Sequence, residues 1–273
     1  RKSTINLKGI AIGNGLLDGD SNYQAGFDYL LGHGLVTTDW YEKKLEACCQ
    51  CTAGTQHECN FTKAPNKTKC ESVPDTYVST PNLYNIYDEC YPDLDLQHAF
   101  NTYSKQHFDK MGVKFALNGE YKRNVNKPKC PVNGHTPYLN LPEVRKALHV
   151  REDAKHWKGC GGSYDPSGGY TIQTRIAIDL INKYKLEKLV IYNGDFDTRC
   201  NFIADERFVD GLGFKKTNRY DPWHVDGVIG GFVANYERGL SFVLFRGAGH
   251  MVPQDKPEAA LHFFESFLGL KKL

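Results

Sequence analysis

The sequence predicts an α/β protein, in which short apolar strands alternate with amphipathic helices. Two apolar runs, "INLKGIAIGNG" and "EKLVIYNGDFD", each end in small turn-forming residues, and a third, "SFVLFRGAGH", ends in glycines and a histidine. Runs this short are typical of buried strands rather than helices. The segments between them place apolar residues at helical spacing. Strand, helix, strand, helix is the order expected of an α/β sheet.

The composition is that of an ordinary globular chain and excludes several classes of partner. Its 273 residues are 40% hydrophobic and 24% charged, with a net charge of +2. That length allows one large core with a subsidiary lobe. The near-neutral charge does not favour nucleic acid or an anionic membrane as a partner. No apolar stretch approaches the roughly 18 to 20 residues that span a bilayer, so we expect no membrane association.

The first half of the chain changes character along its length. Residues 5–14 alternate small and β-branched residues, which predicts a buried strand and its turn, and residues 22–46 have helical spacing. Residues 47–140 are polar, rich in cysteine, and interrupted by Pro and Asn. We therefore expect a loop-rich lobe held by disulfides rather than by a deep core.

The second half returns to regular patterns. "LPEVRKALHV", "YTIQTRIAIDLINKY" and "ADERFVDGL" predict helices, and Leu189–Tyr192 predicts a strand that ends at Asn193 and Gly194. "WHVDGVIGGFVANYERGLSFVLF" predicts two strands joined by a turn. The last pattern, "KPEAALHFFESFLGL", predicts an amphipathic helix whose inner face consists of Ala260, Phe264, Phe267 and Leu268.

The cysteines indicate an oxidising compartment. Five of the nine lie between residues 48 and 70, beside two glycosylation sequons at Asn60 and Asn66. This combination predicts a lysosomal or secreted protein. A zinc site is the rival interpretation of four of these cysteines, but adjacent cysteines do not suit the C-x₂-C spacing of structural zinc. The four residues are Cys48, Cys49, Cys51 and Cys59.

Two loops that follow strands contain possible catalytic groups. One holds Asp195 and Asp197, and the other holds His250. Functional side chains of α/β sheets lie on loops beyond the carboxyl ends of the strands. In the order acid then histidine, these residues suggest the acid and base of a nucleophilic triad. Metal hydrolysis through the same residues is less favoured, because the clustered histidines of catalytic zinc are absent from the sequence. We expect no metal and no cofactor.

Three segments identify a family resemblance. "GIAIGNGLLD", "YNGDFDTRCNFIADERFV" and "VLFRGAGHMVPQDKPEAAL" resemble the serine carboxypeptidases, and the resemblance is weakest between residues 100 and 127. It implies the carboxy-terminal part of an α/β-hydrolase sheet with a disulfide-rich cap insertion. Residues 1–14 would supply a central strand, residues 15–140 the cap lobe, and residues 141–273 the rest of the core.

The resemblance also implies roles for individual residues. Asp197, rather than Asp195, matches the catalytic acid, and His250 matches the base; Asp195 would instead bind backbone amides and shape its loop. Cys200 and Met251 match residues of the substrate pocket. The implied reaction is the removal of carboxy-terminal residues from peptides or proteins.

Disulfide pairings follow from the same resemblance. It pairs Cys48 with Cys70, Cys49 with Cys59, and Cys90 with Cys130, and it gives Cys160 a partner outside this sequence. Cys51 has no counterpart and would be able to compete for Cys59 or to form a homodimer.

The nucleophile of this family lies in a G-x-S-x-G elbow that the sequence lacks. Gly161-Gly162-Ser163-Tyr164 is followed by Asp165, and Ser241 lies inside an apolar strand. In the family, the elbow precedes the strand that "LKGIAIGNG" resembles, so the resemblance implies a serine upstream of residue 1, in an amino-terminal half or a separate chain linked through Cys160. We therefore expect this chain alone to be inactive. The alternative is a non-catalytic module that binds and protects other lysosomal hydrolases.

Overall fold

The computed structural model describes residues 6–49, 66–72, 82–88, 135–158 and 173–273. Its contacts divide the chain into two units. The first comprises Arg1–Val73, Leu83–Ile86 and Gly168–Leu273, and the second Pro74–Asn82 and Tyr87–Ser167. In the second unit, two short helices follow one another, α5 (His135–Leu139) and α6 (Pro142–Ala147). The domain bounds expected from the resemblance, at residues 14 and 140, stay a prediction.

The first unit is built on a five-stranded mixed sheet. Its strands are β1 (Gly9–Gly13), β2 (Lys188–Gly194), β3 (Asp221–Val225), β4 (Val228–Asn235) and β5 (Leu240–Phe245), in the spatial order β1-β2-β5-β4-β3. β1, β2 and β5 are parallel, whereas β4 and β3 are antiparallel to their neighbours. The three parallel strands therefore place their carboxyl ends at one edge of the sheet, which we call the catalytic edge.

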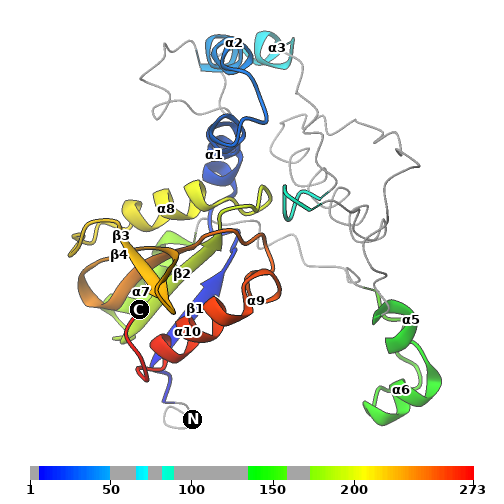
Figure 1. Cartoon of the computed structure of the whole chain (residues 1–273). Helices are drawn as coiled ribbons and strands as arrows, with labels where there is room; N and C mark the ends of the chain where they lie inside the picture. The colour runs from blue at the N-terminus through cyan, green and yellow to red at the C-terminus, as the bar shows by residue number, and fades with distance from the viewer. Residues whose placement is uncertain (1–5, 50–65, 73–81, 89–134, 159–172) are drawn as a thin grey trace. The chain divides into compact units, whose positions relative to one another are not determined.

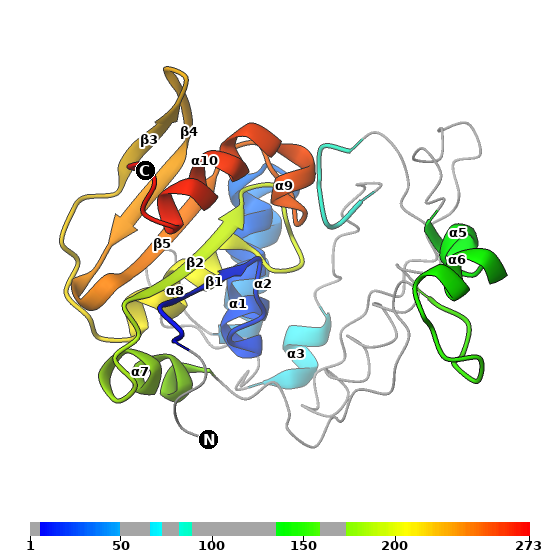
Figure 2. The same ribbon diagram turned by 90° about the horizontal axis from the view of Figure 1, so that it is seen from below.

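Helices cover both faces of this sheet, as Figures 1 and 2 show. α7 (Thr174–Asn182) and α8 (Phe202–Gly211) pack on one face. α9 (Val252–Asp255) and α10 (Pro257–Phe267) pack on the other. In β2, Leu189 and Ile191 point to the α7–α8 side, while Val190 points to the α9–α10 side. This alternation explains why the run is apolar throughout, because both faces of a central parallel strand are buried.

Two further long helices, α1 and α2, follow β1 in the chain. α1 (Gly19–Gly32) packs against α8, where the Tyr29 and Phe202 rings lie 6.0 Å apart and Arg207 forms an ion pair with Asp28. α2 (Thr38–Cys49) follows, and the short α3 (Lys67–Ser72) lies against it. None of the helices in the described parts of the chain has the length and apolar character needed to cross a membrane.

The structure corrects two expectations about the second half. The segment expected to form two strands forms three, because two turns interrupt it. Asp226 and Gly227 have φ values of 48° and 81°, and Arg238 and Gly239 of 62° and 76°. Pairs of left-handed residues are typical of tight hairpin turns. The sequence pattern predicted one of these two turns.

The second correction concerns the buried face of α10. Ala259 and Phe263 are its buried residues, with Ala260 and Phe267 partly buried beside them. Phe264 and Leu268 are each 54% exposed, so their placement on the inner face was wrong. The apolar residues surround much of this helix, and their spacing alone does not select the face that meets the sheet.

Candidate active site

The acid loop, residues 195–201, connects β2 to α8 at the catalytic edge. Asn201 ends the loop by capping α8, accepting a hydrogen bond from the Ala204 amide at 3.1 Å. At its start, a Cβ atom on Gly194 would lie 2.2 Å from the carbonyl oxygens of Ala248 and Gly249. Only glycine lets the loops after β2 and β5 approach this closely.

Asp197 is fully buried in this loop and accepts hydrogen bonds at both carboxylate oxygens. Oδ1 accepts from the Arg199 amide at 2.8 Å. Oδ2 accepts from Asn14 Nδ2 at 2.9 Å and lies 2.8 Å from His250 Nδ1. These partners satisfy a buried carboxylate and fix its orientation. Asp197 is therefore held in place from three separate backbone segments.

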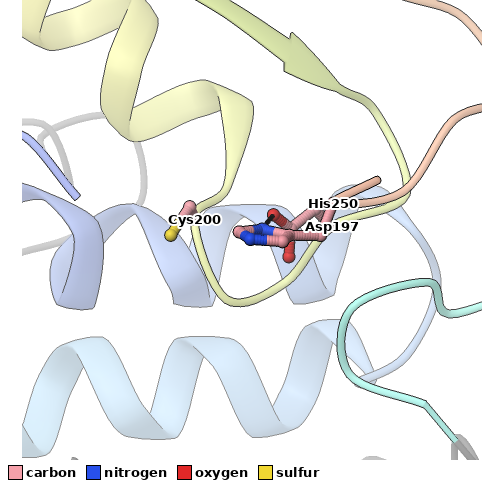
Figure 3. Close-up of side chains that lie close together, drawn as sticks. All are labelled: Asp197, Cys200 and His250. Carbon is pink, nitrogen blue, oxygen red and sulfur yellow. Dashed lines mark hydrogen bonds and ion pairs between the residues drawn. The ribbon is translucent and has the colours of Figure 1, made fainter. Parts of the chain in front are cut away.

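His250 lies on the loop that follows β5, with 30% of its side chain exposed beside the fully buried Asp197. Figure 3 shows Asp197, Cys200 and His250 close together. Since Nδ1 faces Asp197, the neutral imidazole is expected to carry its proton there and to leave Nε2 as the base. Folding thus brings together Asp197 and His250, which lie 53 positions apart in the sequence.

Asp195 binds backbone amides of the loop between β5 and α9, residues 246–251, which we call the histidine loop. Its Oδ1 accepts from the Gly247 amide at 2.6 Å and from the Ala248 amide at 3.3 Å. Burial raises the pKa of Asp195 to about 6, although these amide donors oppose the rise. Asp195 therefore joins the acid loop to the histidine loop but does not contact the imidazole through any described hydrogen bond.

A short segment, Leu83–Ile86, binds both loops. The His250 amide donates to the Tyr84 carbonyl at 2.7 Å, and the Ile86 amide donates to the Phe196 carbonyl at 3.0 Å. The Tyr84 ring lies edge-on to the imidazole, with centroids 5.0 Å apart. A Cβ on Gly249 would lie 2.3 Å from the Tyr84 carbonyl oxygen, so glycine is required for this contact. The sequence did not reveal this segment, because it lies within the polar, cysteine-rich region.

Cys200 is a free, buried thiol beside the pair. Burial raises its pKa well above the ordinary value, and the charges of Asp197 and Asp205 raise it further. The ligand atoms of Asp197, Cys200 and His250 lie within 4.8 Å of one another. Metal binding needs a thiolate, however, and the carboxylate is already engaged by three donors. The donor chemistry suits proton transfer better than metal binding, and we assign no metal site.

Behind the acid loop lies a second buried carboxyl group, Asp205. Its Oδ2 accepts from Asn193 Nδ2 at 2.9 Å, and the same amide nitrogen donates to the Cys200 carbonyl at 3.0 Å. Burial raises the pKa of Asp205 to about 8, and the nearby charge of Asp197 adds to the rise. Asp205 is therefore largely protonated at acidic pH.

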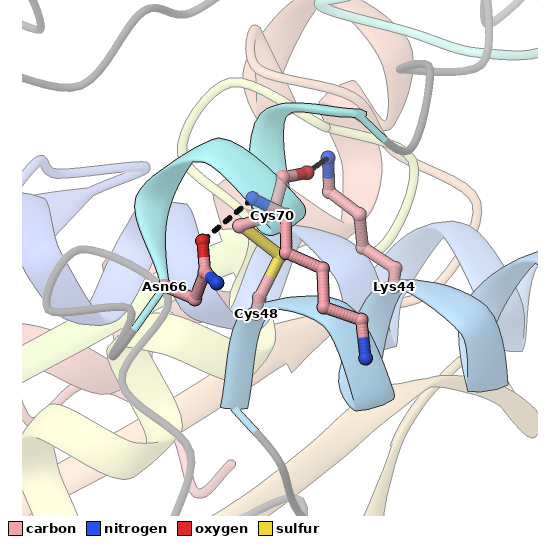
Figure 4. The surroundings of a disulfide bond; sticks show 5 residues. Lys44, Cys48, Asn66 and Cys70 are labelled. Carbon is pink, nitrogen blue, oxygen red and sulfur yellow. Dashed lines mark hydrogen bonds between the residues drawn. A yellow bond between two sulfur atoms is a disulfide. The ribbon is translucent and has the colours of Figure 1, made fainter.

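The disulfide region of the first unit consists of α2, α3 and their neighbours. A disulfide joins Cys48 to Cys70, the pairing implied by the resemblance (Figure 4). Cys49 is also disulfide-bonded, to a residue outside the described part of the chain. The exposed Asn66 precedes α3, and its Oδ1 accepts from the Lys69 amide at 2.9 Å. The predictions for Cys51, Cys59, Asn60, Cys90, Cys130 and Cys160 fall outside the described residues.

The remaining expected site residue, Met251, directly follows His250 and is 56% exposed. Its role in a substrate pocket stays a prediction, as does that of Cys200. Sequence reasoning missed Asn14, which it had considered only as part of the turn after the first strand. The one available signal was an asparagine between two glycines at a strand end.

The mixed sheet, with its helices on both faces and a carboxylate–imidazole pair at the carboxyl ends of β2 and β5, defines an α/β-hydrolase-like protein. Comparison with known proteins specifies the family. The family described as serine carboxypeptidase matches residues 1–269, so the chain belongs to the serine carboxypeptidase family.

Two curated relatives illustrate the similarity. The lysosomal protective protein of Mus musculus is 32% identical over 97% of this chain. The serine carboxypeptidase ctsa-4.1 of Caenorhabditis elegans is 30% identical over 99% of it. The matches cover 59% of each relative, so the chain spans little more than half of their length.

A solved structure supports the fold. The chain resembles Kex1(delta)p of Saccharomyces cerevisiae, described as a prohormone-processing carboxypeptidase, with a TM-score of 0.55. The sequences are 19% identical, and the match covers 98% of this chain and 56% of that protein. At this identity the likeness concerns the fold alone.

Proposed function

We propose that this chain supplies the acid and the base of a Ser-Asp-His triad in a serine-type carboxypeptidase. The observation that supports this most directly is the 2.8 Å contact between His250 Nδ1 and Asp197 Oδ2. A buried carboxylate that orients a partly exposed imidazole is the arrangement needed by a general base. The nucleophilic serine would come from polypeptide outside the 273 residues, since they contain no G-x-S-x-G segment.

In the proposed reaction, His250 Nε2 accepts the serine hydroxyl proton while the serine oxygen bonds to the scissile carbonyl carbon. The imidazolium then gives that proton to the leaving amine, and the carbon–nitrogen bond breaks to leave an acyl-enzyme. Water repeats the cycle: His250 takes its proton, the hydroxide oxygen bonds to the acyl carbon, and the serine recovers the proton as it leaves. Asp197 holds the imidazole in its orientation and stabilises the imidazolium.

We propose peptides or proteins with a free carboxyl terminus as substrates, by analogy with the family. For location we propose the secretory route, ending in the lysosome or outside the cell. The Cys48–Cys70 disulfide and the sequon at the exposed Asn66 support an oxidising compartment. The name of the murine relative supports the lysosome. Digestion of the native protein with an N-glycosidase tests the route, because an unchanged mass would contradict it.

The partner that contributes the serine is identified by an intact-mass measurement of the native protein, with and without reductant. Release on reduction of a second polypeptide with a G-x-S-x-G peptide would support a two-chain enzyme tethered through Cys160. A single larger mass that contains this peptide would support one continuous enzyme. A chain that runs alone near 30.9 kDa plus glycans would instead favour the non-catalytic binding role.

The catalytic assignment is tested in the native enzyme by release of the terminal amino acid from a peptide with an apolar carboxyl end. His250→Ala is expected to abolish release without unfolding the protein. His262→Ala is the matched control, since His262 is a half-buried histidine that contacts the Lys272 carbonyl and stacks on Trp223, with no described contact to Asp197 or His250. Normal turnover by the His250→Ala enzyme would contradict the proposed triad.

A further inference from the structure

We propose that Asn14 is a positioning residue that fixes the Asp197 carboxylate for its contact with His250. The inference rests on the proposed function and adds a member to the same site. Asn14 Nδ2 donates at 2.9 Å to Asp197 Oδ2, the same oxygen that lies 2.8 Å from His250 Nδ1. One carboxylate oxygen thus receives both the orienting amide and the imidazole.

The backbone around Asn14 is rigidly placed. Asn14 directly follows β1, and its amide donates to the Tyr192 carbonyl in β2 at 2.8 Å. Its φ of 44° lies in the left-handed region, which asparagine and glycine tolerate better than other residues. The residue is only 4% exposed. Its side chain therefore approaches Asp197 from a fixed point on the neighbouring strand.

The orientation of the amide is set by charge. Turning the amide over would place Oδ1 against the carboxylate, so that two acceptors faced each other. In the observed orientation Oδ1 is buried and has no hydrogen-bond donor among the described residues. Leaving a buried acceptor unsatisfied is unfavourable, and such exceptions call for a functional explanation. Here the gain is the Nδ2–H donated to Asp197.

The three donors to Asp197 come from different parts of the chain. The Arg199 amide at Oδ1 belongs to the acid loop itself, His250 to the loop after β5, and Asn14 to the end of β1. Without Asn14, Oδ2 would have only the imidazole as a partner, and the Arg199 amide and the imidazole would be left to oppose rotation of the carboxylate about the Cβ–Cγ bond. Misplacement of a catalytic partner by about 1 Å is enough to lower a rate about 100-fold.

The test uses the native enzyme and the variant Asn14→Gly. Glycine accepts the left-handed backbone but lacks the amide, so a residue needed only for the turn would tolerate the change. We expect kcat to fall roughly 10- to 100-fold with KM nearly unchanged. Asn14→Asp keeps the shape but brings a second carboxylate against Asp197, and a larger loss is expected. Asn218→Gly is the matched control, because Asn218 binds Asp221 and the Asn235 amide instead.

A spectroscopic measurement separates this proposal from the proposed function. The low-field proton resonance of His250 Nδ1–H, assigned by its loss in His250→Ala, reports the contact with Asp197 without any turnover. We expect Asn14→Gly to shift or broaden this resonance, whereas Asn218→Gly leaves it unchanged. A shift in an enzyme that releases no amino acid would refute the proposed function and leave the positioning role standing.

Two outcomes would overturn the positioning role. The first is an Asn14→Gly enzyme with wild-type kcat and an unchanged resonance. The second is an Asn14→Gly enzyme that loses both kcat and the resonance and also melts far below Asn218→Gly, since general unfolding would then explain both losses.

Discussion

The catalytic edge and the disulfide region fix their residues by different physical means. At the edge, hydrogen bonds join buried polar groups that lie up to 183 positions apart in sequence. In the disulfide region, one covalent bond links α2 to α3 around a small apolar cluster of Phe27, Tyr41 and Leu45. Polar contacts select one orientation, whereas a disulfide chiefly limits the unfolded chain. Changes at the edge should therefore alter turnover, and changes in the disulfide region should alter stability.

The largest expected effect is that of Asp197→Asn at the catalytic edge. The amide is able to donate to His250 Nδ1 and favours the wrong imidazole tautomer, so we expect kcat of the whole enzyme to fall about 10⁴-fold. Steady-state peptide hydrolysis measures this, and thermal unfolding should change far less. A loss smaller than that of Asp195→Asn would reverse the assignment of the two aspartates.

The variant Asp205→Asn tests how the stability of the folded protein depends on pH. Because folding raises the pKa of Asp205 from 3.8 to about 8, the protonated form favours the folded state. This contribution is full below pH 3.8, declines as the pH rises toward 8, and is lost above it. The difference between these two pKa values corresponds to at most about 6 kcal/mol of folding free energy.

The variant should remove that part of the pH dependence and should be more stable than the parent above pH 8. Urea unfolding at pH 5 and pH 9 measures the difference. If the parent and the variant lose stability in parallel between these two pH values, Asp205 is not the responsible group.

Removal of the Cys48–Cys70 disulfide should affect stability and spare the site. The bond closes 22 positions of sequence, for which loop entropy predicts a loss of about 3 kcal/mol in the Cys48→Ala, Cys70→Ala variant. Denaturant unfolding measures the loss, with kcat expected to stay within about twofold where the variant is folded. A large fall in kcat of the folded variant would break the proposed contrast between the two regions.

The smallest expected effect is that of Asn85→Ala in the segment Leu83–Ile86. Asn85 Nδ2 donates at 3.1 Å to Asp255, which also accepts from the Gly249 amide at 2.7 Å. Loss of one such bond should cost about 1 kcal/mol. Thermal unfolding and kcat measured together will show whether the segment supports the histidine loop. Asn85→Asp, which opposes two carboxylates, should be worse than alanine.

Local patterns predicted much of this molecule because they determine local structure. β2 was predicted from its apolar run and its Asn-Gly end, and a helix was predicted for "ADERFVDGL", which lies mostly in α8. One turn was predicted between β3 and β5 where the structure has two, and Arg238 in the second turn adopts a left-handed conformation that its residue type does not indicate. The buried face of α10 was misplaced because the sheet, and not the helix, decides which apolar residues are covered.

The candidate site likewise contains residues that local patterns predicted and residues that they did not. His250 and the pair Asp195 and Asp197 were predicted because their residue types suit catalysis and each follows an apolar run, and the family resemblance then selected Asp197. Asn14 was not, since its importance arises from a neighbour 183 positions away, which no local pattern records. Leu83–Ile86 acts mostly through backbone groups, which every sequence possesses. Contacts of this kind appear only when the strands and loops are placed in space.

The strand order has a consequence for when the contact between His250 and Asp197 forms during folding. β1 pairs with β2 across most of the chain, and β5 then pairs with β2 on its other side. Such distant pairing makes folding slow, because a large loss of chain entropy precedes the contacts that compensate for it. The imidazole meets its carboxylate only after β5 has docked. A nascent polypeptide would therefore lack the contact between His250 and Asp197 until sheet assembly is nearly finished.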